Sequence, residues 1–204
     1  MSNAEAREQS LRLFIAIPLP AGVKEAIERA QSSLRAAVSK GRIGWTRPEQ
    51  FHLTIKFLGD IDSARITFLA QDLTRVCQNF PALDLRAQTI GAFPNWRFPR
   101  VIWIGIQEGE NRLGRLYELI STVTAQYTGR PDRDSFDGHV TIGRVKGIQR
   151  PEAQGLSKIA ADLARHSFGQ WMANTLELMR SELLPEGARH TCLAEIELEK
   201  ENHG

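Results

Sequence analysis

Two histidines of this sequence stand in the same short pattern. His52-Leu53-Thr54-Ile55 and His139-Val140-Thr141-Ile142 both read His-x-Thr-apolar, and they lie 87 residues apart, from position 52 to position 139. Each copy sits in a run of residues typical of a β-strand, in which alternate side chains share one face. We therefore expect each histidine to point to the same side as its threonine, while the apolar residues between them face a core.

This pair of motifs is suited to displacement at phosphorus. Histidine has an unperturbed pKa of about 6.5, so it can take or give a proton near neutral pH. Two imidazoles on opposite sides of one phosphorus atom could act as general base and general acid. The hydroxyl groups of Thr54 and Thr141 could donate hydrogen bonds to the phosphoryl oxygens. Such a site needs no metal.

A structural explanation competes with this one. Threonine is common in strands, so a single His-x-Thr copy is better explained as a hydrogen-bonded histidine on a half-buried strand. Two copies in matching strand contexts favour the chemical explanation.

The composition is that of an ordinary globular protein. The 204 residues are 42% hydrophobic and 25% charged, with a formal net charge of +2, which is too small to indicate nucleic acid by itself. Two cysteines form no disulfide framework or metal-ligand cluster, and we expect no cofactor and a cytoplasmic location. No apolar run approaches the ~18 residues of a membrane span. Residues 1–10 are expected to be a disordered or tag-derived tail.

The patterns of apolar residues predict an α+β protein. Strands are expected at 11–17, 51–57, 83–90, 101–106, 139–145, 175–182 and 190–197, and helices at 21–38, 63–77 (with Ser63 as N-cap), 111–127 and 151–163. A turn is expected around Gly41 and Gly44, an aromatic and basic loop at 91–100, and a charged loop at 130–137. We interpret 11–199 as one two-lobed domain: two duplicated antiparallel sheets with outer helices, related by a pseudo-two-fold axis, whose central cleft carries both motifs.

Further segments extend the pattern over most of the chain: RLFIAI (12–17), WTRPEQFHLTIKFLG (45–59), GAFP (91–94), PRVIW (99–103), HVTIGRV (139–145) and MRSEL (179–183). In these segments and their order, the sequence resembles the bacterial and archaeal RNA 2′,3′-cyclic phosphodiesterases, also called 2′-5′ RNA ligases, of the two-histidine phosphoesterase superfamily. The resemblance implies a bilobal fold and metal-free opening of a 2′,3′-cyclic phosphate to a 2′-phosphate.

The resemblance also implies roles for individual residues. His52 would give a proton to the leaving 3′ oxygen, and His139 would activate water as the base. Thr54, Thr141 and Arg144 would hold the phosphate. Arg144 has the wrong strand parity to share a face with His139, so it would need a bulge, or its long reach at the strand end, to touch the phosphate.

Two positions depart from the family pattern. Asp137-Gly138 stands where the family has Arg-Pro or a similar pair, and a carboxylate beside a phosphate site is unfavourable unless it points away. His190 stands where the family often has Tyr.

A second group of residues could contact RNA. Arg47, Arg97 and Arg100 with Phe93, Trp96 and Phe98 could form a basic, aromatic rim that stacks bases of single-stranded RNA. The alternative is that Phe93 and Phe98 pack beneath a loop while the arginines are solvated.

The expected function is therefore metal-independent hydrolysis of RNA 2′,3′-cyclic phosphate ends by a monomer, with reversible 2′-5′ ligation as an additional activity. One alternative substrate is a small cyclic phosphate such as ADP-ribose cyclic phosphate. Another alternative, which Asp137 makes reasonable, is a non-catalytic module that binds RNA ends.

Overall fold

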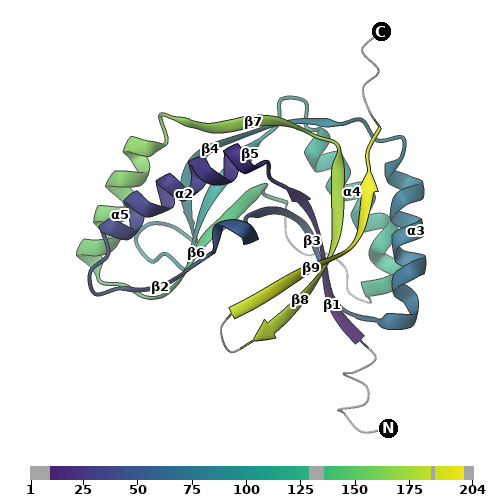
Figure 1. The fold of residues 1–204 in the computed structure, drawn as a ribbon. Helices are drawn as coiled ribbons and strands as arrows, with labels where there is room; N and C mark the ends of the chain where they lie inside the picture. The colour runs from purple at the N-terminus through teal and green to yellow at the C-terminus, as the bar shows by residue number, and fades with distance from the viewer. Residues whose placement is uncertain (1–9, 129–135, 185–186, 200–204) are drawn as a thin grey trace, which may run out of the picture.

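The computed structural model describes residues 10–128, 136–184 and 187–199. The expected tail lies outside these residues except for Ser10, which begins the first strand, and most of the charged loop expected at 130–137 lies outside them too. Within the described part, no helix is both long enough and apolar enough to cross a membrane. The chain forms two antiparallel sheets with helices outside them (Figure 1).

The first sheet has the strand order β3-β1-β8-β9, and the second has β2-β6-β5-β4-β7. The strands of the first sheet are β3 (His52–Asp62), β1 (Ser10–Pro18), β8 (Thr175–Leu184) and β9 (Gly187–Glu197). Those of the second are β2 (Arg42–Trp45), β6 (His139–Gly147), β5 (Val101–Gln107), β4 (Leu83–Phe93) and β7 (Ser167–Ala173). One motif histidine thus begins β3, and the other begins β6.

Each sheet is covered on its outer face by a pair of helices (Figure 1). The helices α3 (Ile66–Cys77) and α4 (Arg112–Thr128) pack together over the first sheet, against β9 and β3. The helices α2 (Ala21–Ala36) and α5 (Arg150–Leu163) pack together over the second, against β7 and β4. Both sheets bury the apolar residues of their strands against these helices.

The two halves of the chain repeat one arrangement. The series β1-α2-β3-α3-β4 corresponds to β5-α4-β6-α5 followed by β8, and the order β3-β1-β8 in one sheet matches β6-β5-β4 in the other. Two strands have exchanged places, because β4 from the first half joins the second sheet and β8 from the second half joins the first. The bilobal α+β fold with duplicated sheets is therefore confirmed.

Some local predictions were wrong. Residues 42–45, expected in a turn, form the edge strand β2, and residues 167–173 form β7, which was not expected at all. Both strands obtain their hydrogen bonds from distant partners, so their short sequences carry little signal. The helix expected from Ser63 starts with a 3-10 turn (Ser63–Arg65), and its cap is Asp62, whose carboxylate accepts from the Ala64 N–H at 2.9 Å. The strand β4 also continues to Phe93, into the expected loop.

A buried glutamine connects α2 to both motif regions. Gln31 is 2% exposed, and its Nε2 donates to the carbonyl oxygens of Thr46 and Ile142, both at 2.8 Å. Thr46 lies in the segment that leads to His52, and Ile142 belongs to the second motif. The Thr46 N–H also donates to the Ile142 carbonyl at 3.0 Å. One side chain therefore fixes the segment before the first motif against the strand of the second.

This connection predicts a measurable cost. In Gln31→Met the side chain keeps its length but cannot donate, so the partly buried Thr46 carbonyl loses its bond from the Gln31 amide. We expect a loss of about 1–3 kcal/mol in the free energy of unfolding, measured with urea. Gln71→Met, at an exposed position of α3, is the matched control and should change stability by less than about 0.5 kcal/mol. Equal effects of the two substitutions would contradict this role.

Candidate active site

Both motif strands carry a bulge at the same position. In the first sheet Ala16 pairs with Thr54 and Ile15 pairs with Lys56, so Ile55 is skipped. In the second sheet Trp103 pairs with Thr141 and Ile102 pairs with Gly143, so Ile142 is skipped. In each strand the extra residue is the third after the histidine.

The bulge changes which residues share a face with the histidine. After it, the fifth residue beyond each histidine is exposed, namely Phe57 (63% exposed) in β3 and Arg144 in β6, while Val145 turns back toward the core. Without the bulge, Arg144 would point to the opposite side from His139. The structure thus supplies the bulge that Arg144 needs.

Both imidazoles are held by the same backbone hydrogen bond. His52 Nδ1 lies 2.7 Å from the Gln50 carbonyl oxygen, and His139 Nδ1 lies 2.7 Å from that of Asp137. A carbonyl can only accept, so each neutral ring carries its proton on Nδ1 and has its lone pair on Nε2. The nitrogen that can exchange a proton with a substrate is therefore Nε2 in both cases.

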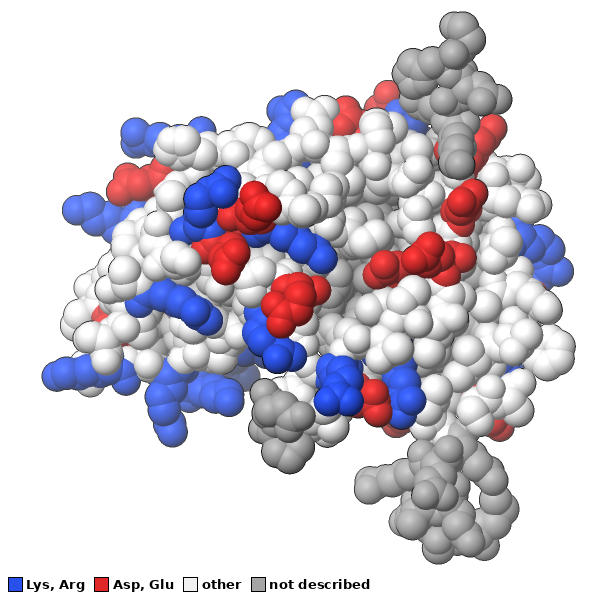
Figure 2. Space-filling view, viewed as in Figure 1, with Lys and Arg blue, Asp and Glu red and all other residues white. Residues whose placement is uncertain are grey.

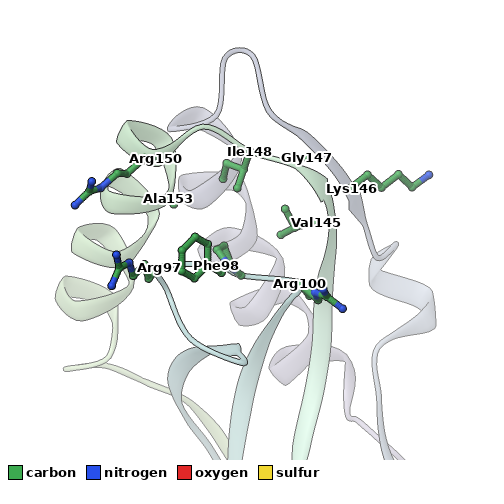
Figure 3. Close-up of a pocket in the computed structure, with 10 residues that line it drawn as sticks. Arg97, Phe98, Arg100, Val145, Lys146, Gly147, Ile148, Arg150 and Ala153 are labelled. Atoms are coloured by element: carbon green, nitrogen blue, oxygen red, sulfur yellow. The ribbon is translucent and has the colours of Figure 1, made fainter.

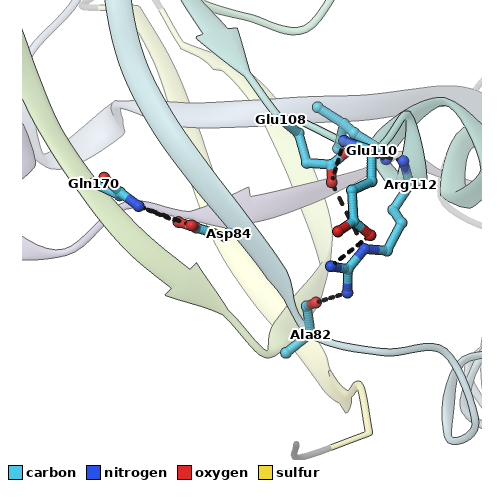
Figure 4. A network of polar contacts seen from close by, with 7 residues as sticks. Ala82, Asp84, Glu108, Glu110, Arg112 and Gln170 are labelled. Atoms are coloured by element: carbon cyan, nitrogen blue, oxygen red, sulfur yellow. Dashed lines mark hydrogen bonds and ion pairs between the residues drawn. The ribbon is translucent and has the colours of Figure 1, made fainter.

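The segment before His139 is fixed by the start of α4. Gly138 fits closely there, because a Cβ on it would lie 3.1 Å from Leu113, and its carbonyl accepts from the Ile106 N–H at 2.8 Å. The start of α4 is itself held by Glu108, which accepts from the Arg112 N–H at 2.6 Å, while the Arg112 side chain donates to the Ala82 carbonyl at 3.2 Å (Figure 4).

This environment explains the departure at 137 and 138. The close fit at Gly138 favours a residue without a side chain, because Leu113 would have to shift to admit a Cβ. Asp137 contributes its backbone carbonyl to His139, and its own side chain is exposed.

His52 lies in a cluster of rings on the first sheet. Its ring centroid is 4.9 Å from that of Phe14 on β1 and 5.2 Å from that of His190 on β9, and His190 also contacts Phe14 at 4.9 Å. Among the described residues, Nδ1 of His190 is buried and has no hydrogen-bond partner. His190 therefore packs beside the first motif histidine.

His139 has a corresponding aromatic environment on the second sheet. Its ring centroid lies 5.1 Å from that of Phe93 and 6.3 Å from that of Trp103, and those two rings are 5.1 Å apart. Trp103 lies directly over Gly91 on the neighbouring strand, where any Cβ would collide with the indole. Glycine at 91 is thus required for the ring that supports His139.

The surroundings of His52 lower its pKa to about 4. Burial is the main cause, and the charges of His190, Lys24 and Arg144 act in the same direction, whereas the bond to the Gln50 carbonyl opposes them. In the free protein at pH 7 this imidazole is therefore neutral.

The influence of Arg144 also shows how the two motifs are placed. Arg144 is on the strand of the second motif, yet its charge acts on His52, and β3 and β6 are in contact. The surface between the two halves of the molecule is hollowed (Figure 2). The structure thus places the two motif strands side by side.

A group of acidic residues lies on the same face of the first sheet as Thr54. Thr54 pairs with Ala16, Ala16 with Glu177, and Glu177 with Glu195, so these four form one row across the sheet. The ligand atoms of Glu177, Glu195 and Cys192 lie within 4.8 Å of one another. Burial and the charge of Glu195 raise the pKa of Glu177. Sequence spacing gave no sign of this cluster.

The expected RNA-binding rim is divided in the structure. Phe93 packs against His139, and Trp96 is half-buried against the core. Arg47 is paired with Glu49 at 3.2 Å. Arg97 and Arg100 line a separate pocket with Phe98, which is 66% exposed and so does not pack beneath the loop.

The cluster around His52 and His139 contains residues that sequence analysis did not assign to the site. They are Phe14, Lys24, Trp103, Glu177 and Cys192, and His190 was noted only as a departure. Phe14 lies in a run of apolar residues and resembles any core position, and Lys24 resembles any cation on an amphipathic helix. Only the register of the sheets brings them to the motifs.

Comparison with known proteins agrees with this geometry. The sequence model of the LigT-like phosphoesterases matches residues 17–103 and again residues 104–190, one match for each motif. This chain belongs to the LigT-like phosphoesterase family.

Similar proteins include two archaeal relatives named RNA 2′,3′-cyclic phosphodiesterase. The one from Methanothermobacter thermautotrophicus is 28% identical over 89% of this chain and 95% of its own length. The one from Archaeoglobus fulgidus is 30% identical over 87% of this chain and 94% of its own length. The crystal structure of TT0787 of Thermus thermophilus matches with a TM-score of 0.74 and 27% identity, covering 94% of this chain and all of that one.

The low pKa of His52 predicts a dependence of stability on pH. The unfolded chain binds a proton here at its ordinary pKa of about 6.5, and the folded protein only near 4, so acid favours the unfolded state. The contribution of His52 to the free energy of unfolding should be complete above pH 6.5. As the pH falls from 6.5 to 4, the free energy of unfolding should decrease by up to about 3 kcal/mol because this contribution is lost.

The measurement is urea unfolding at several pH values. His52→Gln should show a weaker decline in stability between pH 6.5 and 4 than the native protein, and the control His166→Gln, at an exposed position, should follow the native protein. Identical profiles for the native protein and His52→Gln would exclude the lowered pKa.

Proposed function

We propose that this protein hydrolyses the 2′,3′-cyclic phosphate ends of RNA to 2′-phosphates with His52 and His139 and without a metal ion. The observation that carries the proposal is the matched placement of the two imidazoles, each with Nδ1 bound to the backbone and Nε2 left for the substrate. The activity named for the two archaeal relatives supports the choice of substrate.

In the proposed reaction the two histidines act on opposite sides of phosphorus. His139 Nε2 takes a proton from water as the water oxygen bonds to phosphorus. The bond from phosphorus to the 3′ oxygen breaks, and His52 Nε2 gives its proton to that oxygen. The products are a 3′-hydroxyl and a 2′-phosphate. With an RNA 5′-hydroxyl in place of water, the same steps would join two RNA ends by a 2′-5′ bond.

His52 must gain its proton before it can act as the acid. Burial is the main reason that it is neutral in the free protein, and the positive charges of His190, Lys24 and Arg144 add to that effect. An anionic cyclic phosphate placed among these groups offsets their charge and therefore raises the pKa of His52. We infer that His52 is protonated together with substrate binding.

The remaining charge would be held by groups on the same two strand faces. Thr54 and Thr141 would donate to the phosphoryl oxygens, and Arg144, exposed beyond the bulge, would pair with them. Both motifs come from one chain, so a monomer can perform the reaction.

The assignment of acid and base predicts different responses to the leaving group. On adenosine 2′,3′-cyclic phosphate, His52→Asn and His139→Asn should each lower kcat about a hundredfold or more. When sulfur replaces the bridging 3′ oxygen, the leaving thiolate needs no proton. His52→Asn should then recover most of its rate, and His139→Asn should not.

Thr54→Ala provides the control for this experiment. This substitution should slow the hydrolysis of both substrates to a similar degree, because Thr54 holds the phosphate whether oxygen or sulfur leaves. Recovery by His139→Asn instead of His52→Asn would reverse the two roles, and recovery by neither would exclude acid catalysis by a histidine.

The absence of a metal requirement is tested by chelation. Dialysis against EDTA should leave kcat within about twofold, because the two threonines and Arg144 supply the charge stabilisation. Glu177→Gln, which removes a carboxylate from the Glu177–Cys192–Glu195 cluster, should also leave the rate insensitive to added Mg²⁺, Mn²⁺ or Zn²⁺. Loss of activity on chelation and its return with one of these ions would refute a metal-free mechanism.

A further inference from the structure

A basic pocket lies at the end of β6, outside the set of residues that the proposed mechanism uses. It has a volume of about 400 Å³, within the range of small-molecule sites. It is lined by the loop before β5, the end of β6 and the first turn of α5 (Figure 3). Arg97 and Arg150 lie on one side of it, and Arg100 and Lys146 point away on the other.

The charge of this pocket is of one sign. Its lining includes these four cations and no carboxylate, and none of the four forms an ion pair with a carboxylate of the described residues. Lys and Arg side chains are also most numerous over the half of the molecule that contains α5 and β2 (Figure 2). Cations left without counter-charges around a cavity attract an anionic ligand.

The floor between the two pairs of cations is apolar and includes an exposed aromatic ring. Phe98 is 66% exposed, the Arg97 guanidinium lies 5.3 Å above its ring, and Val145 and Ile148 lie beside it. An exposed ring with a cation over it offers a stacking surface for a nucleobase. Phosphates on both sides and a base in the middle describe one nucleotide of a single strand better than they describe an acidic peptide.

The pocket is connected to the surroundings of His139 by backbone hydrogen bonds, but it lies at the far end of β6. Phe93, which contacts His139, accepts through its carbonyl from the Arg100 N–H at 2.7 Å, and Arg100 accepts from the Val145 N–H at 2.9 Å. Val145 is six residues beyond His139, or about 20 Å at 3.3 Å per residue and less with the bulge. A mononucleotide held at the two histidines would not reach it.

We propose that this pocket binds a nucleotide located upstream of the cyclic phosphate end in the RNA strand. The proposal rests on the proposed function, and it makes an oligonucleotide a better substrate than a cyclic mononucleotide. The base lies on Phe98, and the phosphates that flank this nucleotide run out of the pocket toward the cations around it.

The test compares adenosine 2′,3′-cyclic phosphate with a penta-adenylate ending in the same group. In the double variant Lys146→Ala/Arg150→Ala, KM for the pentamer should rise about tenfold with little change in kcat, and the kinetics of the mononucleotide should stay the same. The slope of log(kcat/KM) for the pentamer against log salt should become less steep by about 1.4, the value for two lost phosphate contacts on a single strand. Phe98→Ala should also raise KM for the pentamer only, and Phe98→Trp should preserve it.

The double variant Lys158→Ala/Arg165→Ala is the control for lost charge, since both cations are exposed and outside the pocket. Equal losses on the two substrates, or no loss on either, would overturn the proposal. If the native protein hydrolyses neither substrate, the proposed function fails, and binding of a labelled penta-adenylate decides about the pocket by itself. Weaker binding by the pocket variants alone would support the pocket, while unchanged binding, or equal binding of a glutamate-rich peptide, would overturn it.

Discussion

Each motif strand must bury apolar side chains in a core on one face and present its histidine and threonine on the other face. Strict alternation gives one face to each, and it would send the fifth residue after a motif histidine to the wrong side. A bulge at the third residue changes this in both β3 and β6. The histidine, the threonine and the fifth residue then share one face, while the core keeps its apolar residues. The two fifth residues are Phe57 and Arg144, so the repeated geometry supplies an aromatic ring from one half and a cation from the other.

The relative position of the two motifs follows from the way the halves interlock. The exchange of β4 and β8 means that neither sheet can form from one half alone. The strand β2 pairs with β6, with Trp45 opposite Gly143, and the chain then continues within a few residues to His52. Gln31 fixes this segment to the bulge of β6. The relative position of the two motif histidines, which come from different sheets, thus depends on backbone pairing and on one buried amide, which are rigid elements.

The sequence predicted the parts of this structure that rest on local patterns. The four helices follow the spacing of apolar residues, and the motif strands follow their own composition. The two motif histidines stood out in the sequence because their pattern occurs twice. The neighbours of these histidines depend instead on which strands lie side by side: His190 on β9 meets His52 on β3 across β1 and β8, and Glu177 lies in the row of Thr54 through Ala16. The spacing of residues in the sequence does not encode which strands pair or in which register. The sequence could therefore show only that Arg144 needs a bulge to share a face with His139, not that the bulge exists. For the same reason Lys24 and Trp103 were missed.

The charges around the site also define a direction for a bound strand. Glu177 and Glu195 continue the row of Thr54 across the first sheet, whereas Arg144 and the cations of the pocket follow one another along and beyond the end of β6. A polyanion that places its terminal phosphate between the histidines is repelled by the carboxylates and attracted by the cations. The ribose and base of the end can still donate hydrogen bonds to carboxylates. For an RNA end bound between the histidines as proposed, the field of the protein favours one orientation, with the phosphates directed toward the second sheet, and this orientation would bring an upstream nucleotide toward Phe98.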